Sequence, residues 1–175
     1  MESRRHKHLS FPGSPRAVMA TGWSLVCLCV IAAPALLAHS CGVAGSMVYL
    51  LFSRICHQIP ERSFSLFGYP LAVCHRCSGI YAGMLLGCFV NIDSMHRTAY
   101  TRRFWVLGAV LPLAFDALAP MAGLWTSTGL TRFFSGLLFG TIASSLVMRG
   151  LTELAQDASW RPLSMQSPQS KGDTL

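Results

Sequence analysis

Charged residues are scarce in this sequence. They make up 12% of its 175 residues, against about 25% in an ordinary soluble domain. Hydrophobic residues account for 52%, which together with the shortage of charge excludes an ordinary soluble domain. We expect an integral membrane protein whose length allows about four or five spans of ~20 residues and leaves no separate soluble domain.

The sequence also lacks any recognisable nucleic-acid module, although its net charge is +7. The Lys and Arg residues lie in short tails and turns beside apolar runs, and no basic stripe is interleaved with aromatic residues. Anionic lipid headgroups and topology signals produce such a distribution. The expected partner is therefore the lipid bilayer, and no nucleic-acid partner is expected.

Apolar runs divide the chain into predicted helices. They cover residues 17–39, 43–55, 78–92, 104–124 and 133–148. The run 43–55 is too short for a full span and predicts a half-membrane helix, and the turn formers in 58–73 predict a loop. The fold class expected is an all-α membrane protein, a bundle of four transmembrane helices, or five if 43–55 crosses, with a cysteine-containing loop.

The ends of the chain are polar. Residues 1–16 form a basic tail predicted to be disordered, 17–150 a single transmembrane domain, and 151–175 a flexible polar tail. A basic start before an apolar run also describes a signal peptide, with Ala38-His39-Ser40 as a cleavage site. The run exceeds the usual length of about 7–15 residues, which favours a first span that is retained.

The distribution of Lys and Arg predicts the topology, because cytoplasmic segments hold the excess. With four spans, ten of the fourteen basic residues lie on the side of the two tails, whereas with five spans the division is eight against six. We therefore expect a multi-pass protein of the cell (inner) membrane with both termini in the cytoplasm and the cysteine loop facing outside.

A compact group of cysteines and histidines lies between the apolar runs. Cys74-x-x-Cys77 places two thiols within reach of one metal ion, and Cys56 and His57 add two candidate ligands eighteen residues earlier. Four thiolate and imidazole ligands fit the tetrahedral preference of zinc, while Cu(I) or an iron–sulfur cluster are alternatives. His75 is a substitute fourth ligand. No CxxCH string is present, so covalent haem attachment is not indicated.

Other uses of these cysteines stay open. Cys74 and Cys77 precede a predicted helix whose dipole would lower a thiol pKa, so a redox couple is an alternative. A structural disulfide involving Cys56 is another on the outer face, and buried inert thiols are the third. Cys27, Cys29 and Cys88 lie inside apolar runs, where a thiol is usually a small hydrophobe.

One acidic residue, Asp116, interrupts the fourth apolar run. An ionisable group at membrane depth needs a partner, and Arg132 at the start of the last run is the predicted one. If the metal site has an open position, Asp116 is a candidate base and Arg132 a candidate ligand for an anionic substrate. The alternative is a buried ion pair that only joins two helices.

Glycines recur at every fourth residue in two of the runs. Gly79, Gly83 and Gly87 form one such face, and Gly136 and Gly140 form another. Small-xxx-small faces allow close helix approach, so we expect the third and last runs to pack together. A homo-oligomer formed through these faces is the alternative.

The strings Cys56-His57-Gln58-x-Pro60-x-Arg62-Ser63-Phe64 and Cys74-x-x-Cys77-x-Gly79-Ile80-Tyr81-x-Gly83 resemble a prokaryotic family of small membrane proteins known as domain of unknown function 2085. The resemblance continues through Asp116 and Thr128-x-x-x-Arg132-x-x-Ser135-Gly136, and so covers about residues 56–140. In that family a small residue usually occupies the place of His75, which favours His57 as the shared ligand.

Two positions depart from the family pattern. Ala117 and Gly129 are unlike its usual residues, so polar contacts near Asp116 are expected to differ in this chain. The resemblance implies membership and no activity. The leading hypothesis is a membrane protein with a Cys/His zinc site; a thiol–disulfide or electron-transfer protein and a non-catalytic assembly or transport accessory are the alternatives. The sequence does not indicate a substrate or decide whether the protein is an enzyme.

Overall fold

The computed structural model describes residues 15–90, 99–124 and 126–160. Residues 1–14 of the predicted tail 1–16, residues 161–175 of the predicted tail 151–175, and the part of the basic turn that contains Arg97 lie outside the described residues. Within the described part the helices are those of an all-α fold, as predicted, and one two-stranded hairpin that was not predicted lies between them. Five helices correspond in order to the five apolar runs.

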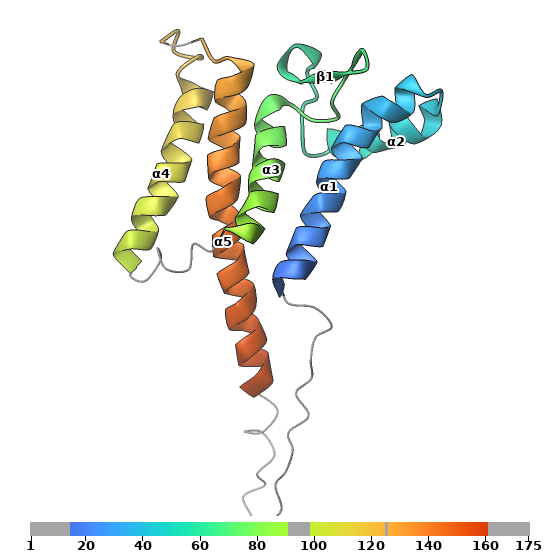
Figure 1. Ribbon diagram of the computed structural model, residues 1–175. Coiled ribbons are helices and arrows are strands. Elements are labelled where there is room, and N and C mark those ends of the chain that lie inside the picture. Colours follow the sequence, from blue (N-terminus) through green and yellow to red (C-terminus); the bar gives the residue numbers. More distant parts are fainter. Residues whose placement is uncertain (1–14, 91–98, 125, 161–175) are drawn as a thin grey trace, which may run out of the picture.

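The first two helices differ in length as their apolar runs do. Helix α1 (Pro15–Ala38) opens with proline at its first position, where the missing N–H would be unpaired in any case. Pro34 lies inside the helix and is buried, and the helix continues past it. Helix α2 (Gly42–Ser53) is half as long, and in Figure 1 it stays beside one end of α1.

The predicted loop after α2 carries a little regular structure. A 3-10 turn, η1 (Pro60–Arg62), precedes the hairpin of β1 (Ser65–Leu66) and β2 (Tyr69–Pro70). Phe67 and Gly68 connect the strands, with φ of 55° and 81°. A type I′ turn, one of the two favoured two-residue hairpin loops, needs positive φ at both central positions, and glycine supplies it without strain. This hairpin replaces part of the plain loop that was predicted for residues 58–73.

Helices α3 (His75–Phe89) and α5 (Gly129–Trp160) pack closely, because glycines occupy the positions where their backbones approach. A Cβ at Gly79 would overlap the Phe133 carbonyl, and one at Gly83 the Leu137 carbonyl. From the other side, a Cβ at Gly140 would overlap the Ile80 carbonyl. The predicted joining of the third and last runs is confirmed, and both glycine faces are used within one chain.

Helix α4 (Ala99–Leu118) completes the bundle by packing against α5. Figure 1 shows α4, α5, α3 and α1 side by side in that order, with α2 and the hairpin at the upper end. The start of α1 and the end of α5 both point to the opposite end. Helix α5 runs through 151–160, the first part of the segment predicted as a flexible tail.

The outer surface of the bundle is apolar. Pro15–Ala38 and Gly129–Thr152 are long and apolar enough to cross a membrane, by length and composition. Large apolar side chains such as Leu28, Leu107 and Phe134 are exposed, whereas Asp116 and Ser144 are buried. Exposed apolar side chains around buried polar ones are the distribution expected where the surrounding solvent is lipid.

Candidate metal centre and arginine pocket

Three of the four predicted ligands come together at the upper end of α3. The Sγ atoms of Cys56, Cys74 and Cys77 all lie within 4.8 Å of one another. Cys56 follows the end of α2, Cys74 is the N-cap of α3, and Cys77 lies in its first turn. A CxxC string at a helix start turns both thiols toward one point, and the loop returns Cys56 to it.

The thiol cluster, meaning Cys56, Cys74 and Cys77, lies against the main apolar core. Cys56 is buried among Val30 and Ala33 of α1, Phe52 of α2 and Val73 of the loop. The Cys74 backbone N–H donates to Cys56 Sγ at 3.2 Å. Hydrogen bonds from backbone N–H groups to sulfur are a means by which proteins stabilise metal-bound thiolates.

Hydrogen bonds among the thiols shift the pKa of Cys74. The pKa of Cys74 is lowered to about 4, chiefly because the Cys77 thiol donates a hydrogen bond to it. Burial opposes this shift, while the backbone N–H of Cys77, the Cys56 thiol and the backbone N–H of Arg76 add to it. The two backbone N–H groups are the donors that a helix N-terminus presents to an anion. This shift favours the thiolate form of Cys74.

Gln58 fixes the loop that carries the cluster, a role that sequence reasoning missed. Its Nε2 donates to the Tyr49 carbonyl of α2 at 2.7 Å and to the Ala72 carbonyl at 2.8 Å. Tyr49 in turn donates its hydroxyl to the Pro70 carbonyl. Gln58 has φ of 48°, in the left-handed region. Its place in the Cys-His-Gln string was the only sequence signal.

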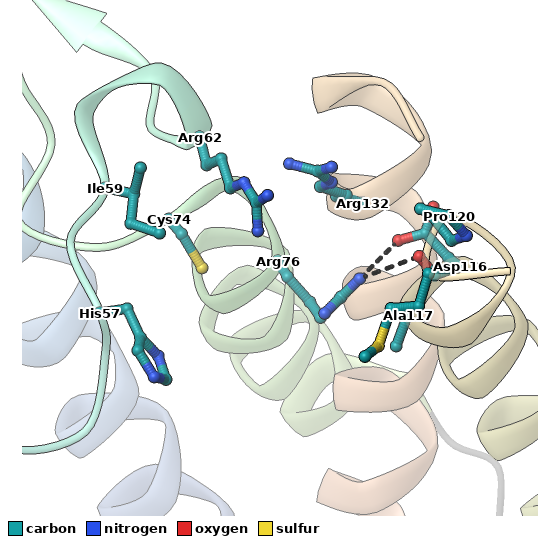
Figure 2. Close-up of a pocket in the computed structure, with 10 residues that line it drawn as sticks. His57, Ile59, Arg62, Cys74, Arg76, Asp116, Ala117, Pro120 and Arg132 are labelled. Atoms are coloured by element: carbon teal, nitrogen blue, oxygen red, sulfur yellow. Dashed lines mark hydrogen bonds and ion pairs between the residues drawn. The ribbon is translucent and has the colours of Figure 1, made fainter. Parts of the chain in front are cut away.

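The two histidines have separate positions. His57 is exposed and is not part of the group of atoms within 4.8 Å, but it lines a pocket into which Cys74 also faces (Figure 2). His75 packs edge-on against Phe64, with ring centroids 4.3 Å apart, and close to Gly129. The structure therefore brings His57 to the edge of the site and engages His75 in ring packing.

The pocket beside the cluster has a volume of about 440 Å³. Six of the ten residues that line it are ionisable: His57, Arg62, Cys74, Arg76, Asp116 and Arg132. It thus joins one thiol of the cluster to Asp116 and Arg132, which sequence analysis had predicted to lie near each other and near the cysteines. We call it the arginine pocket.

The ion pair of Asp116 differs from the predicted one. Arg76 of α3 pairs with the buried carboxylate, with Nη2 2.8 Å from Oδ2, and the same Nη2 donates to the Asp116 carbonyl at 3.3 Å. Arg132 is instead linked through Ser127, to whose Oγ its Nε donates at 2.9 Å. Arg76, and not the predicted Arg132, is therefore the ion-pair partner of Asp116.

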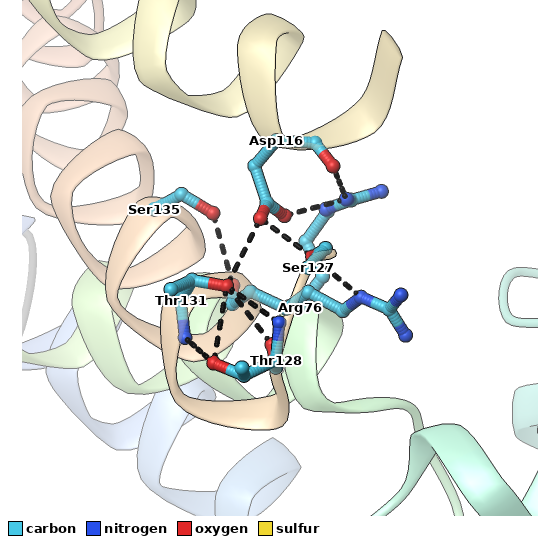
Figure 3. A network of polar contacts seen from close by, with 7 residues as sticks. Arg76, Asp116, Ser127, Thr128, Thr131 and Ser135 are labelled. Atoms are coloured by element: carbon cyan, nitrogen blue, oxygen red, sulfur yellow. Dashed lines mark hydrogen bonds and ion pairs between the residues drawn. The ribbon is translucent and has the colours of Figure 1, made fainter. Parts of the chain in front are cut away.

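The other carboxylate oxygen accepts two hydroxyl hydrogen bonds (Figure 3). Ser127 donates to Asp116 Oδ1 at 2.6 Å and Thr131 donates to it at 3.1 Å. Thr131 also belongs to the start of α5, where its backbone N–H donates to Thr128 Oγ1 in an N-cap hydrogen bond. Asp116 therefore connects α3, α4 and the first turn of α5.

Comparison with known proteins places these residues in a family. Residues 56–146, about half the chain, match the family model described as "Predicted membrane protein (DUF2085)". The chain belongs to this family. The match begins at Cys56 and includes the thiol cluster, the three pocket arginines and Asp116.

Two relatives of this DUF2085 protein are archaeal. An uncharacterised protein of Methanocaldococcus jannaschii is 37% identical over 95 residues, which are 53% of this chain and 61% of the relative. An uncharacterised protein of Methanothermobacter thermautotrophicus is 36% identical over 95 residues, 54% of this chain and 85% of the relative. No solved structure matches the chain.

Proposed function

We propose that this membrane protein binds a zinc ion through Cys56, Cys74 and Cys77. The observation that carries the proposal is the convergence of three thiols from two separate segments within 4.8 Å. Zinc–thiolate bonds of about 2.3 Å hold tetrahedral sulfur atoms roughly 3.8 Å apart, so the cluster needs little rearrangement. The N–H bond to Cys56 Sγ and the thiolate character of Cys74 suit the same use. Soft thiolates also accept Cu(I) or an iron–sulfur cluster, so metal analysis should cover copper and iron.

The fourth position of such a site would face the arginine pocket, because Cys74 is the cysteine that lines it. We propose His57, which lines the pocket too, as the fourth ligand. A fourth protein ligand closes a zinc site for a structural role, whereas water in that position leaves it open for chemistry. Asp116 already accepts bonds from three side chains, so we assign it to positioning Arg76 and Arg132 rather than to proton transfer.

Replacement of His57 tests the fourth position. Loss of even an outer partner of a metal ligand typically weakens binding about 10–100-fold, so His57→Ala should weaken zinc binding at least that much. A competition titration with a chelator in detergent measures it, and His39→Ala, at an exposed histidine of the same end, is the control. Unchanged affinity in His57→Ala would assign the fourth position to water.

We propose four spans, formed by α1, α3, α4 and α5, with both termini in the cytoplasm and the cysteine loop outside. Two features of the bundle support this proposal. Helix α2 remains at one end of the bundle, and the first residues of α1 and the last residues of α5 lie together at the opposite end. The charge distribution of the sequence agrees with this orientation, and among the described residues four arginines lie toward the cysteine end: Arg54, Arg62, Arg76 and Arg132.

Thiol labelling tests this topology. Cys41, exposed between α1 and α2, should react with a membrane-impermeant maleimide in intact cells, and Cys41→Ser should remove that label. A cysteine introduced at exposed Arg103 should react only after permeabilisation. The reversed pattern, with position 103 labelled in intact cells and Cys41 protected, would reject the proposed orientation.

The two cysteines at the N-terminus of α3 also favour a second function, thiol–disulfide exchange. A low-pKa thiol at an N-cap followed by a second thiol three residues later is the arrangement of thiol–disulfide exchange proteins. In that case Cys74 attacks a disulfide of a partner, and Cys77 resolves the mixed disulfide. Purified protein would then be free of metal and would contain a reducible Cys74–Cys77 bond.

A further inference from the structure

The arginine pocket holds more positive charge than its own acidic groups balance. Arg62, Arg76 and Arg132 line it, and among the ten described residues of its wall Asp116 is the one carboxylate. That carboxylate is engaged by Arg76, Ser127 and Thr131. Neither Arg62 nor Arg132 forms an ion pair with any residue that the structure describes.

The two remaining guanidinium groups are directed at the same space. Figure 2 shows Arg62, from η1, and Arg132, from α5, extending toward each other across the pocket. Arg132 is held by its Nε bond to Ser127, which leaves its terminal nitrogens free to face the pocket. Like charges that face each other repel, so an arrangement of this kind is stable when an anion lies between them.

A buried donor below these groups is also without a partner. Arg76 Nε is buried and has no hydrogen-bond partner within the described part of the chain, although Nη2 of the same side chain is paired. An unsatisfied buried donor costs free energy unless a ligand or water accepts from it. Arg62 and Arg132 therefore offer donors to the pocket, and Arg76 adds a third positive charge to its wall.

The placement of these arginines is unusual for a membrane protein. Within the part of the chain that the structure describes, four arginines lie at the cysteine end of the bundle; three line this one pocket, and the fourth, Arg54, is exposed at the end of α2. Topology signals favour few positive charges on that side. Their concentration in one pocket is therefore better explained by a ligand than by orientation in the membrane.

We propose that the arginine pocket binds an oxyanion of the phosphate class, supplied by a lipid headgroup or by a water-soluble phosphate compound. Guanidinium groups match phosphate oxygens with paired hydrogen bonds. The pocket volume of about 440 Å³ accommodates a phosphate with part of the molecule that carries it. This inference does not depend on the metal proposed for the thiol cluster.

Binding to the full-length protein in nanodiscs tests the proposal in two arms. In neutral phosphatidylcholine nanodiscs, pyrophosphate is titrated and its binding is measured by calorimetry. In the second arm, native mass spectrometry measures retention of phosphatidic acid against phosphatidylcholine. Binding in the first arm indicates a soluble ligand, and selective retention in the second indicates a lipid headgroup. Absence of both would overturn the proposal.

Paired variants separate the pocket from general surface charge. One charge-assisted hydrogen bond corresponds to about 10–100-fold in affinity, so Arg62→Gln and Arg132→Gln should each weaken binding by that factor. Arg54→Gln removes the same charge outside the pocket and should leave binding unchanged. Equal loss in all three variants, or in none, would overturn the assignment. Arg76 is left intact because its removal would strip Asp116 of its ion pair.

Discussion

Replacing Cys74 with serine is expected to abolish metal binding. The purified wild-type chain should contain about one zinc per molecule, whereas Cys74→Ser should contain less than a tenth of that amount. Three protein thiolates would share one ion, and a serine hydroxyl is a poor substitute because it stays protonated at neutral pH. Elemental analysis of protein purified without added metal measures the ratio.

Matched cysteines make this test specific. Cys41 is exposed and lies outside the cluster, so Cys41→Ser should retain the full metal content. Cys56→Ser should behave like Cys74→Ser, since its sulfur belongs to the same group. Metal-free wild-type protein with a Cys74–Cys77 disulfide would contradict the metal proposal and favour thiol–disulfide exchange.

The metal should also stabilise the loop end of the bundle. A ligand that binds only the folded state raises stability with its concentration relative to Kd, so chelation should lower the unfolding temperature of the wild type. The cluster is joined to α1 and α2 through the core around Cys56. The chelator should have no such effect on Cys74→Ser, and an equal effect on both proteins would show that it acts elsewhere.

Replacing Gly83 with leucine is expected to have the largest effect on stability. A Cβ there would overlap the Leu137 carbonyl and approach the Thr141 backbone nitrogen, and neither backbone atom can rotate away. The two helices must separate, which costs about 1–3 kcal/mol or more. For a domain of this size we expect the unfolding temperature to fall by roughly 5–10 °C, measured by size-exclusion chromatography after heating in detergent.

A glycine in open space serves as the control. Gly108 in α4 has nothing within 4 Å of a built Cβ, so Gly108→Leu should change stability by no more than about 0.5 kcal/mol. Because Gly83→Leu separates α3 from α5, it should also disturb the link from Arg76 on α3 to Asp116 on α4. Equal melting of the two variants would show that α3 and α5 are not closely packed.

Several features of the chain could be predicted from local patterns. The apolar runs marked all five helices, since the hydropathy of a segment is a property of that segment alone. The CxxC spacing before an apolar run placed Cys74 and Cys77 at a helix start, as found. The glycine repeats predicted that the third and last runs pack together, because small residues permit close backbone approach wherever they recur.

The ion-pair partner of Asp116 could not be predicted from local patterns. The sequence offered Arg132 for Asp116, but which arginine reaches the carboxylate depends on how α3, α4 and α5 are rotated about their axes. The glycine contacts bring α3 deep against α5, so Arg76 pairs with Asp116 while Arg132 is held by Ser127. In the same packed arrangement, the side chains of Arg62 and Arg132 line one pocket.

The sequence by itself determined that this protein belongs to the family, that it forms an apolar helical bundle and that it carries a group of thiols. Composition and residue spacing can be taken directly from the sequence. Only the tertiary structure decided that Cys56 joins Cys74 and Cys77, that Gln58 holds the loop in place, and that three arginines share a pocket. Contacts between distant segments depend on helix rotation and loop path, which result from packing of the whole chain.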